Sequence, residues 1–252
     1  MNSIPIESSA VVGSPDQEVP RRPARGERRA ARTRAAILDA AERAFRVDGY
    51  RGTKVEEIAA AADVAVGSIY SHFGNKDGLY HALAERSVEL FALYMEQAYR
   101  DDRTPLEQVL AAGDAYLRFH LEHPGAFRFL AFAGIESAPV EDDELRARIT
   151  DRMEELVDRF RQQVQAAIDA GEARPLDAHQ LSRFLWGAWN GVVGLSMRPD
   201  RLALSDDEID ACIATGRRLV LEGLVAPSAR DEAGDARARL VRVDSPPAAP
   251  AG

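Results

Sequence analysis

Apolar residues recur with a helical period along most of the chain. In the first such segment, which is expected to begin near Thr33, they fall three and four positions apart and share one helix face: Ile37, Leu38, Ala41, Ala44 and Phe45. Gly49 is expected to end this helix. Thr53 and Glu56 have the spacing of a capping box, in which two side chains satisfy free backbone amides, so a second helix is predicted from there.

Two short amphipathic segments joined by a tight turn come next. The first presents Val55, Ile58, Ala59 and Ala62 on one face, and the second, from about Ala65 to His72, is expected to bury Ile69 and Phe73. Asn75 is expected to cap a fourth helix. Two helices of this size between Thr53 and Phe73 have the dimensions of a helix-turn-helix, whose second helix enters the major groove of DNA.

The remaining helices are longer, with ranges of about 106–122, 124–134, 143–171, 178–197 and 205–224. The helix over 178–197 is apolar nearly all round, so it must be covered on both sides. The last helix carries Gly216 and Gly223 seven positions apart, where both can allow close approach of a neighbour. These last two helices are therefore predicted to form a homodimer interface.

The composition fits a folded all-α protein with irregular ends. Of its 252 residues 46% are hydrophobic, enough for a core of ordinary size. The predicted organisation is a disordered arm with a basic stretch (1–31), a three-helix DNA-binding domain (32–78), a helical effector-binding and dimerisation bundle (79–225), and a disordered tail (226–252). Both ends are expected to be disordered because they are rich in Pro, Gly, Ser and Ala or Arg.

Charge is unevenly distributed. The net charge of −9 argues against a nucleic-acid partner when the chain is taken whole. Residues 21–34, however, contain seven Arg and one Glu, and residues 77–225 contain 27 acidic against 16 basic residues. The segment 21–76 is thus locally basic. The block 21–34 either follows the DNA backbone as an arm or is a solvated tail.

Several protein classes are disfavoured. A single cysteine, Cys212, excludes an intramolecular disulfide framework, and its apolar helix face predicts buried packing. The longest apolar run, 184–197, is too short to span a membrane, and no signal peptide is recognisable, so a cytoplasmic protein without membrane association is expected. His120 and His123 lie three apart but lack a third metal ligand, so neither a metal nor a cofactor is expected.

Residues 33–98 resemble the DNA-binding domain of the tetracycline-repressor (TetR) family of bacterial transcription regulators. The resemblance rests on the segment ILDAAERAFRVDGYRGTKVEEIAAAADVAVGSIYSHFGNKDGLYHAL and above all on IYSHFGNKDGL; the segments FHLEHPGAFRFLAF and FLWGAWNGVVGL extend it less sharply to residue 225. It implies that Thr53 caps the second helix and touches a phosphate. It also implies that Val66, Gly67 and Ser68 lie closest to the bases, and that Tyr70, His72 and Lys76 hold the backbone.

The chain offers one further candidate DNA contact, and it departs from the family pattern at two positions. The chain has only two lysines, Lys54 and Lys76, and both flank the expected groove helix. Asp63 stands in the turn where the family often has Gly, and Asp tolerates the left-handed conformation that such a turn needs. Ala65 stands where a capping Ser is common, which leaves one amide to water or DNA.

An effector pocket is expected in the second domain, because the family hollows out this region. Its candidate residues are aromatic or polar: Tyr94, Tyr116, Phe119, His120, Phe127, Phe160, Trp186, Trp189 and Asn190. Aromatic residues at helical spacing, however, are usually part of a filled core. Asn190, set among large apolar residues, needs a hydrogen-bonding partner from a ligand, another subunit or the chain itself.

The sequence therefore predicts a homodimeric DNA-binding regulator, most simply a repressor of a near-palindromic double-stranded operator that a small molecule of unknown identity releases. The rival within DNA binding is an effector-independent regulator controlled by its abundance or by a protein partner. A remote alternative is a helical enzyme, for which residues 77–225 offer no nucleophile and base pair, metal-ligand spacing or phosphate loop. A cavity near Trp189 would favour the effector.

Overall fold

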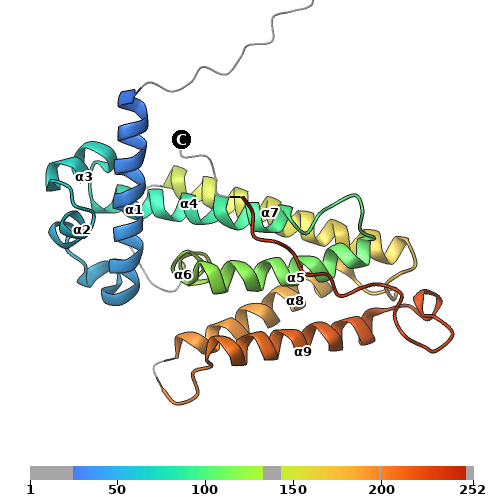
Figure 1. Cartoon of the computed structure of the whole chain (residues 1–252). Helices are drawn as coiled ribbons and strands as arrows, with labels where there is room; N and C mark the ends of the chain where they lie inside the picture. Colours follow the sequence, from blue (N-terminus) through green and yellow to red (C-terminus); the bar gives the residue numbers. More distant parts are fainter. Residues whose placement is uncertain (1–24, 133–142, 199, 248–252) are drawn as a thin grey trace, which may run out of the picture.

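The computed structural model describes residues 25–132, 143–198 and 200–247. Within these ranges every regular element is a helix, and the only strand-like pairings are two isolated bridges, between Ala173 and Val225 and between Arg230 and Ala236 (Figure 1). This confirms the all-α prediction. None of the described helices combines the length and the hydrophobicity needed to cross a bilayer.

A small head lies at one end of the molecule (Figure 1). It consists of α1 (Arg25–Gly52), α2 (Val55–Ala61), α3 (Val66–Phe73) and the start of α4 (Lys76–Glu96). One apolar cluster holds these helices together, and its fully buried members include Ile37, Leu38, Ile58, Ile69, Leu79 and Leu83. The predicted three-helix N-terminal domain, with two short helices after a longer one, is confirmed.

Helix α4 belongs to both halves of the molecule. Its residues up to Ala84 pack in the head cluster, whereas Val88, Phe91 and Met95 pack in the main cluster of the body. The predicted domain boundary at residues 78 and 79 therefore falls within a continuous helix. A single rigid element connects the head to the body.

The body is a bundle of α5 (Pro105–Glu122), α6 (Pro124–Phe132), α7 (Asp143–Asp169), α8 (Ala178–Gly194) and α9 (Asp206–Leu224), with a 3-10 turn at Leu195–Met197. These bounds lie close to those that the apolar pattern predicts. Side-chain caps explain the starts: Asn75, Thr104, Asp177 and Ser205 each accept a backbone amide of the first turn of α4, α5, α8 and α9.

Two predictions about the head are wrong in detail. Residues 25–31 are not disordered, because α1 begins at Arg25 and continues as one helix into the core segment; the rest of the expected arm, 1–24, lies outside the described residues. The N-cap of α2 is Lys54, not Thr53, and the Glu57 carboxylate, not that of Glu56, accepts the Lys54 amide at 3.3 Å. Gly49, expected to end the first helix, interrupts it with a φ of 68°, and helical residues continue beyond this kink to Gly52.

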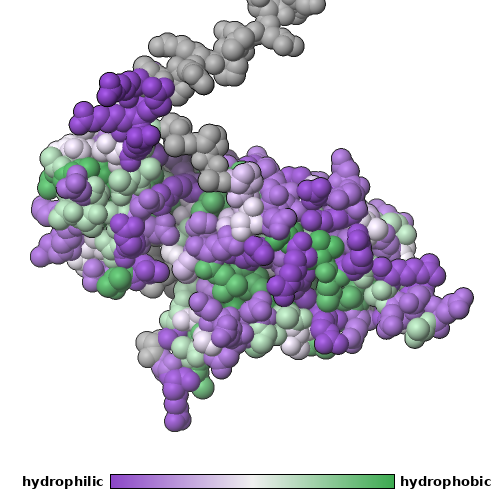
Figure 2. Space-filling model, in the orientation of Figure 1, coloured by the Kyte–Doolittle hydropathy of each residue, from purple (hydrophilic) through white to green (hydrophobic). Residues whose placement is uncertain are grey.

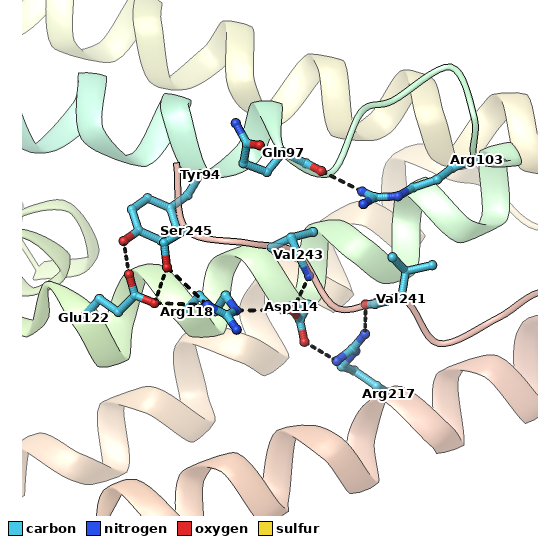
Figure 3. A network of polar contacts seen from close by, with 10 residues as sticks. All are labelled: Tyr94, Gln97, Arg103, Asp114, Arg118, Glu122, Arg217, Val241, Val243 and Ser245. Carbon is cyan, nitrogen blue, oxygen red and sulfur yellow. Dashed lines mark hydrogen bonds and ion pairs between the residues drawn. The ribbon is translucent and has the colours of Figure 1, made fainter. Parts of the chain in front are cut away.

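The expectation of a disordered tail is wrong for residues 226–247. A segment that we call the strap, residues 239–245, lies across α5 beside α9 (Figure 3). Its Val243 is only 1% exposed and belongs to the main apolar cluster. The strap is held because its backbone and side chains meet buried carboxylates of α5, a contact that local composition cannot reveal. Residues 248–252 lie outside the described residues.

Several residues in the last two helices differ from expectation. Cys212 is exposed rather than buried. In α8, Phe184 is 69% exposed and Trp186 is 41% exposed, so the single chain covers this apolar helix on only one side. Gly216 of α9 faces the Trp189 ring of α8, but Gly223 faces open space. The uncovered side of α8 is thus available to another molecule.

Candidate functional site

Helix α3 presents polar and small side chains outward. Ile69 is its one buried residue, whereas Gly67 and Ser71 are exposed and Tyr70 is 48% exposed. Among the described residues nothing hydrogen-bonds the hydroxyls of Ser68, Tyr70 and Ser71. A Cβ atom added at Gly67 would meet no atom within 4 Å. The helix therefore offers free hydroxyl groups around an open backbone position.

The turns before and after α3 each restrict which residue can stand there. Asp63 adopts the expected left-handed conformation, with φ of 52°, so the departure from Gly is tolerated. Ala65 begins α3 without a side-chain cap, as its sequence predicts. After α3, a Cβ atom at Gly78 would lie 2.0 Å from the carbonyl oxygen of Phe73, so only Gly lets α4 start this close to α3.

Lys76 lies where the starts of α2 and α4 meet. Its Nζ donates to the backbone carbonyl of Thr53 at 2.6 Å and lies 4.5 Å from the Tyr50 ring centroid. Tyr50 in turn donates its hydroxyl to Asp77; burial, followed by this bond, raises the pKa of Tyr50. The ammonium group is thus oriented by the head and keeps further N–H donors for a phosphate.

Thr53 does not occupy the position expected of it. Its side chain is buried, 2% exposed, and its hydroxyl donates to the Gly49 carbonyl at 2.8 Å. The residue therefore stabilises the bend at Gly49, near the end of α1, and positions Lys76 through its own carbonyl. Lys54, the new N-cap, is exposed, and His72 is half-buried beside the Phe73 ring.

A basic end of α1 projects beyond the head. Arg25, Arg28, Arg29 and Arg32 are exposed on its first two turns, and this end is uniformly hydrophilic in Figure 2. Arg34 lies 5.3 Å from the Phe73 ring centroid, which fixes this part of α1 against the C-terminal end of α3. The basic residues are consequently carried on a helix and not on a flexible arm, and Arg21 and Arg22 lie outside the described residues.

The body contains two small apolar cavities that share a wall. The first has a volume of about 40 Å³ and lies among α4, α5, α7 and α8. The second has a volume of about 20 Å³. Of the predicted pocket residues, these line one cavity or both: Tyr116, Phe119, Phe127, Phe160, Trp186, Trp189 and Asn190. Tyr94 and His120 line neither. A cavity does lie beside Trp189, as the effector hypothesis requires.

Sequence reasoning missed several lining residues, among them the large apolar side chains of Phe91, Met95 and Met153. Their helical spacing is indistinguishable from that of core residues, which is also their role around the cavity. Whether such residues fill a core or line a cavity depends on how α4 packs against α7, a helix distant in sequence, and local spacing does not report this packing.

Asn190 finds its hydrogen-bonding partners within the chain. Its Oδ1 accepts the Tyr116 hydroxyl at 2.6 Å, and its Nδ2 donates to the Trp186 carbonyl at 3.1 Å. Burial raises the pKa of Tyr116, which keeps the phenol protonated as a donor. This pair forms the polar end of an otherwise apolar wall.

The histidines are not brought together as metal ligands. His120 is 3% exposed, its ring centroid lies 4.9 Å from that of Phe127, and neither ring nitrogen has a described partner. His123 instead shares a 3.0 Å hydrogen bond with the Tyr94 hydroxyl. In the part of the chain that the structure describes, no three His, Cys, Asp or Glu residues are grouped to hold a metal ion.

Polar contacts fix the head to the body beside α4. Arg86 donates to Asp39 at 2.6 Å and to Glu42 at 2.7 Å, both on α1. At the start of α6, a Cβ atom on Gly125 would lie 2.4 Å from the same Glu42 carboxylate. A shift of α4 or α6 would therefore move α1.

Two family models match the chain. The model described as bacterial regulatory proteins, tetR family, matches residues 37–83, and the tetracyclin repressor-like C-terminal domain matches residues 109–220. Among curated relatives, the HTH-type transcriptional regulator RutR of Escherichia coli (strain K12) is 26% identical over 197 residues, covering 75% of this chain and 89% of RutR.

Solved structures share the fold. A bacterial regulatory protein of the tetR family from Rhodococcus RHA1 aligns with a TM-score of 0.63 and 21% identity, over 77% of this chain and 97% of that one. AibR, solved in complex with isovaleryl coenzyme A and operator DNA, aligns with a TM-score of 0.60 and 24% identity, over 73% and 97%. The strap lies beyond the residues that either family model matches.

Proposed function

Because the chain belongs to the TetR family of bacterial transcription regulators, we propose that it is a repressor that binds its operator as a homodimer and is released by a small molecule. The observation that carries the DNA-binding part is the outer face of α3, with free hydroxyls around an open Gly67. A protein of this kind acts where the chromosome is, so we place it in the cytoplasm, with no cofactor.

The head offers two kinds of DNA contact. Val66, Gly67 and Ser68 form the first turn of α3, which enters the major groove and approaches the base edges. Tyr70 and His72 further along, with Lys76 and Lys54, donate to phosphates and set the register. The exposed arginines at the start of α1 follow the phosphate backbone and supply the sequence-independent part of the affinity.

The dimer forms through the uncovered side of α8 and the adjacent α9. Phe184, Gly187, Ala188 and Gly191 are exposed at helical spacing on α8, and Leu195 is exposed in the 3-10 turn that follows it. Leu219 is 65% exposed on α9. Small residues between large apolar ones let a second helix approach closely, and burying them removes apolar surface from water. A twofold dimer places two copies of α3 on half-sites about one helical turn, or a multiple of it, apart.

Effector release follows from the position of the apolar cavity. Its wall includes Phe91 and Met95, which lie on α4, the helix that also holds the head. A molecule that enlarges the cavity displaces α4 and changes the spacing of the two heads. The effector must bind the released conformation more tightly than the DNA-bound one, since otherwise no release follows. AibR, which resembles this chain in fold, was solved with an acyl-CoA and operator DNA.

The size of the cavity favours a second candidate, regulation without an effector. Its volume of about 40 Å³ holds about three waters at roughly 10–15 Å³ each, so an effector must first open it.

A thermal-shift screen of the full-length protein against apolar metabolites separates effector release from regulation without an effector. A stabilising compound that also lowers DNA affinity supports the effector, and none across the screen supports control by abundance or a partner.

The DNA contacts are tested by substitution. Tyr70→Ala and Lys76→Ala should each weaken binding to duplex DNA of any sequence about tenfold, and Lys76→Ala should lower the slope of log affinity against log salt by about one. The control is Gln165→Ala, an exposed residue of α7 far along the chain from the head. Fluorescence anisotropy gives the affinities. Unchanged binding by both head variants would refute the assignment of α3 and α4 to DNA.

A further inference from the structure

A larger cavity lies on the opposite side of α5 from the apolar ones. It has about 220 Å³ of open space between α5, α9 and the strap, against about 40 Å³ beside Trp189. Asp114, Leu117, Arg118 and Leu121 line it from α5, whereas α5 lines the apolar cavity with Ala112, Gly113 and Tyr116. The charged cavity is therefore separate from the proposed effector site, and Figure 3 shows the network around it.

Four of the six charged groups in its lining neutralise one another. Asp114 is buried and accepts Arg217 Nη1 at 2.5 Å and the Val243 amide at 2.8 Å. Glu122 accepts Arg118 Nη1 at 3.2 Å and the Ser245 hydroxyl at 2.7 Å (Figure 3). These carboxylates have little capacity left for a ligand.

The other two charged groups, Asp210 of α9 and Arg242 of the strap, are exposed. Within the described residues, neither of their side chains makes a hydrogen bond or an ion pair, although the charge of Asp210 acts on Arg217. Once the paired groups are set aside, the lining thus presents one free carboxylate and one free guanidinium.

A third group points to a ligand. Arg217 is 7% exposed, and its Nη1 and Nη2 donate to Asp114 and to the Val241 carbonyl, but its Nε is buried without any described partner. A buried N–H donor is normally satisfied. Burial lowers the pKa of the Arg217 guanidinium against the opposing effect of Asp114; more weakly, the positive charge of Arg242 also lowers it and the charge of Asp210 raises it. An anionic oxygen between the two arginines would separate the like charges, and it would satisfy the donor once the side chain turns Nε, which has almost no accessible surface, towards the cavity.

We propose that this cavity binds a small zwitterion of the amino-acid class. Its carboxylate accepts from Arg217 Nε and the Arg242 guanidinium, its ammonium group pairs with Asp210, and its apolar part lies against Leu117, Leu121 and Ala214. A simple anion fits less well, because the six charges of the lining already cancel and three of them are carboxylates. Since Arg242 belongs to the strap and Arg217 to α9, the bound zwitterion holds these two elements together.

The test begins with the full-length protein and the twenty common amino acids, added one at a time at millimolar concentration. At least one should raise the melting temperature and bind saturably in calorimetry. Two analogues of the best amino acid, one without the ammonium group and one without the carboxylate, should bind at least tenfold more weakly. No saturable binding by any amino acid, or equal binding of either analogue, would overturn the proposal.

Variants locate the site. Arg242→Gln and Asp210→Asn remove the two free charges from exposed positions and should each weaken amino-acid binding at least tenfold. Arg201→Gln and Asp207→Asn remove the same charges from exposed positions outside the lining and should leave the affinity within twofold. Binding that survives both lining variants would place the amino acid elsewhere. Neither outcome depends on DNA binding or on the apolar cavity, so the proposed function is tested separately.

Discussion

The head and the body expose opposite kinds of side chain. Helix α3 of the head leaves hydroxyls free at its surface and buries only Ile69, whereas α8 of the body leaves Phe184 and Trp186 at the surface. In the head the free groups are donors, which suits phosphates and base edges. In the body they are apolar, which suits a second protein chain. The two surfaces therefore have different partners, although one helix, α4, connects them.

The interiors differ as well. The described core of the head is almost purely apolar, apart from Thr53, while the body buries Glu107, Asp114 and Arg217 at the strap. Buried charges stabilise only when every one is paired, so the body depends on contacts that span the sequence. Substitutions on the exposed face of α3 should accordingly change DNA affinity with little effect on folding, whereas substitutions at the strap should mainly change folding stability.

The largest effect is expected from Val243→Asp in the strap. The change removes a fully buried apolar side chain and places a charge beside Asp114, so the free energy of unfolding should fall by about 3–5 kcal/mol. Chemical denaturation measures it, and the exposed neighbour Asp244→Asn is the control. A loss within 0.5 kcal/mol, the range of ordinary surface substitutions, would show that the strap does not pack in solution.

The next effect is expected from Phe184→Asp on α8. A charge on the uncovered face should prevent dimerisation, and loss of the second half-site contact should weaken operator binding about a hundredfold, equivalent to about 2.7 kcal/mol. Analytical ultracentrifugation measures the fraction of dimer, and fluorescence anisotropy measures the operator affinity. Leu176→Asp, half-exposed just before α8, is the control. A dimer that persists in Phe184→Asp would exclude this face as the interface.

A smaller effect on affinity, with none on folding, is expected from Gly67→Asp on α3. The added side chain meets no protein atom, so unfolding should be unchanged, but its charge faces DNA and should weaken binding about thirtyfold, or about 2 kcal/mol. Anisotropy and denaturation of the same sample compare the two quantities. Unaltered DNA affinity would mean that the first turn of α3 does not enter the groove.

The smallest effect concerns His120 and pH. Burial lowers its pKa below the ordinary value of 6.5, so the unfolded chain binds the proton more readily. Stability is therefore complete above about pH 6.5 and should fall by up to about 1.4 kcal/mol per pH unit as the pH drops towards the folded-state pKa. His120→Leu should reduce this slope, and the exposed His179→Gln should not. Equal slopes in all three proteins would contradict the burial of a neutral imidazole.

Most of the helices follow from the sequence because each carries its own apolar stripe and cap. The starts of α5, α8 and α9 are set by Thr104, Asp177 and Ser205, all local signals. The strap shows the limit of such reasoning. Val241 and Val243 alternate with Arg242 and Asp244, a pattern typical of a half-buried extended segment, but the surrounding Pro and Ala residues obscure it.

The candidate sites show the same division. The outward residues of α3 are predictable because they share a short helix, and the cavity beside Trp189 is predicted in outline. The internal role of Thr53 is not predictable, because it depends on the Gly49 carbonyl and on Lys76, 23 positions away. Likewise Asp114 meets Arg217 and Val243 more than 100 positions along the chain, so the charged cavity is visible only in the folded protein.

The central claim is that two copies of α3 read a twofold-related DNA site. Selection of bound fragments from a random duplex library by the full-length protein tests it most directly. The account predicts enrichment of a near-palindrome with half-sites about one helical turn, or a multiple of it, apart, and no such enrichment by Gly67→Asp. Enrichment of no sequence by the unaltered protein, or of the same sequence by the variant, would contradict it.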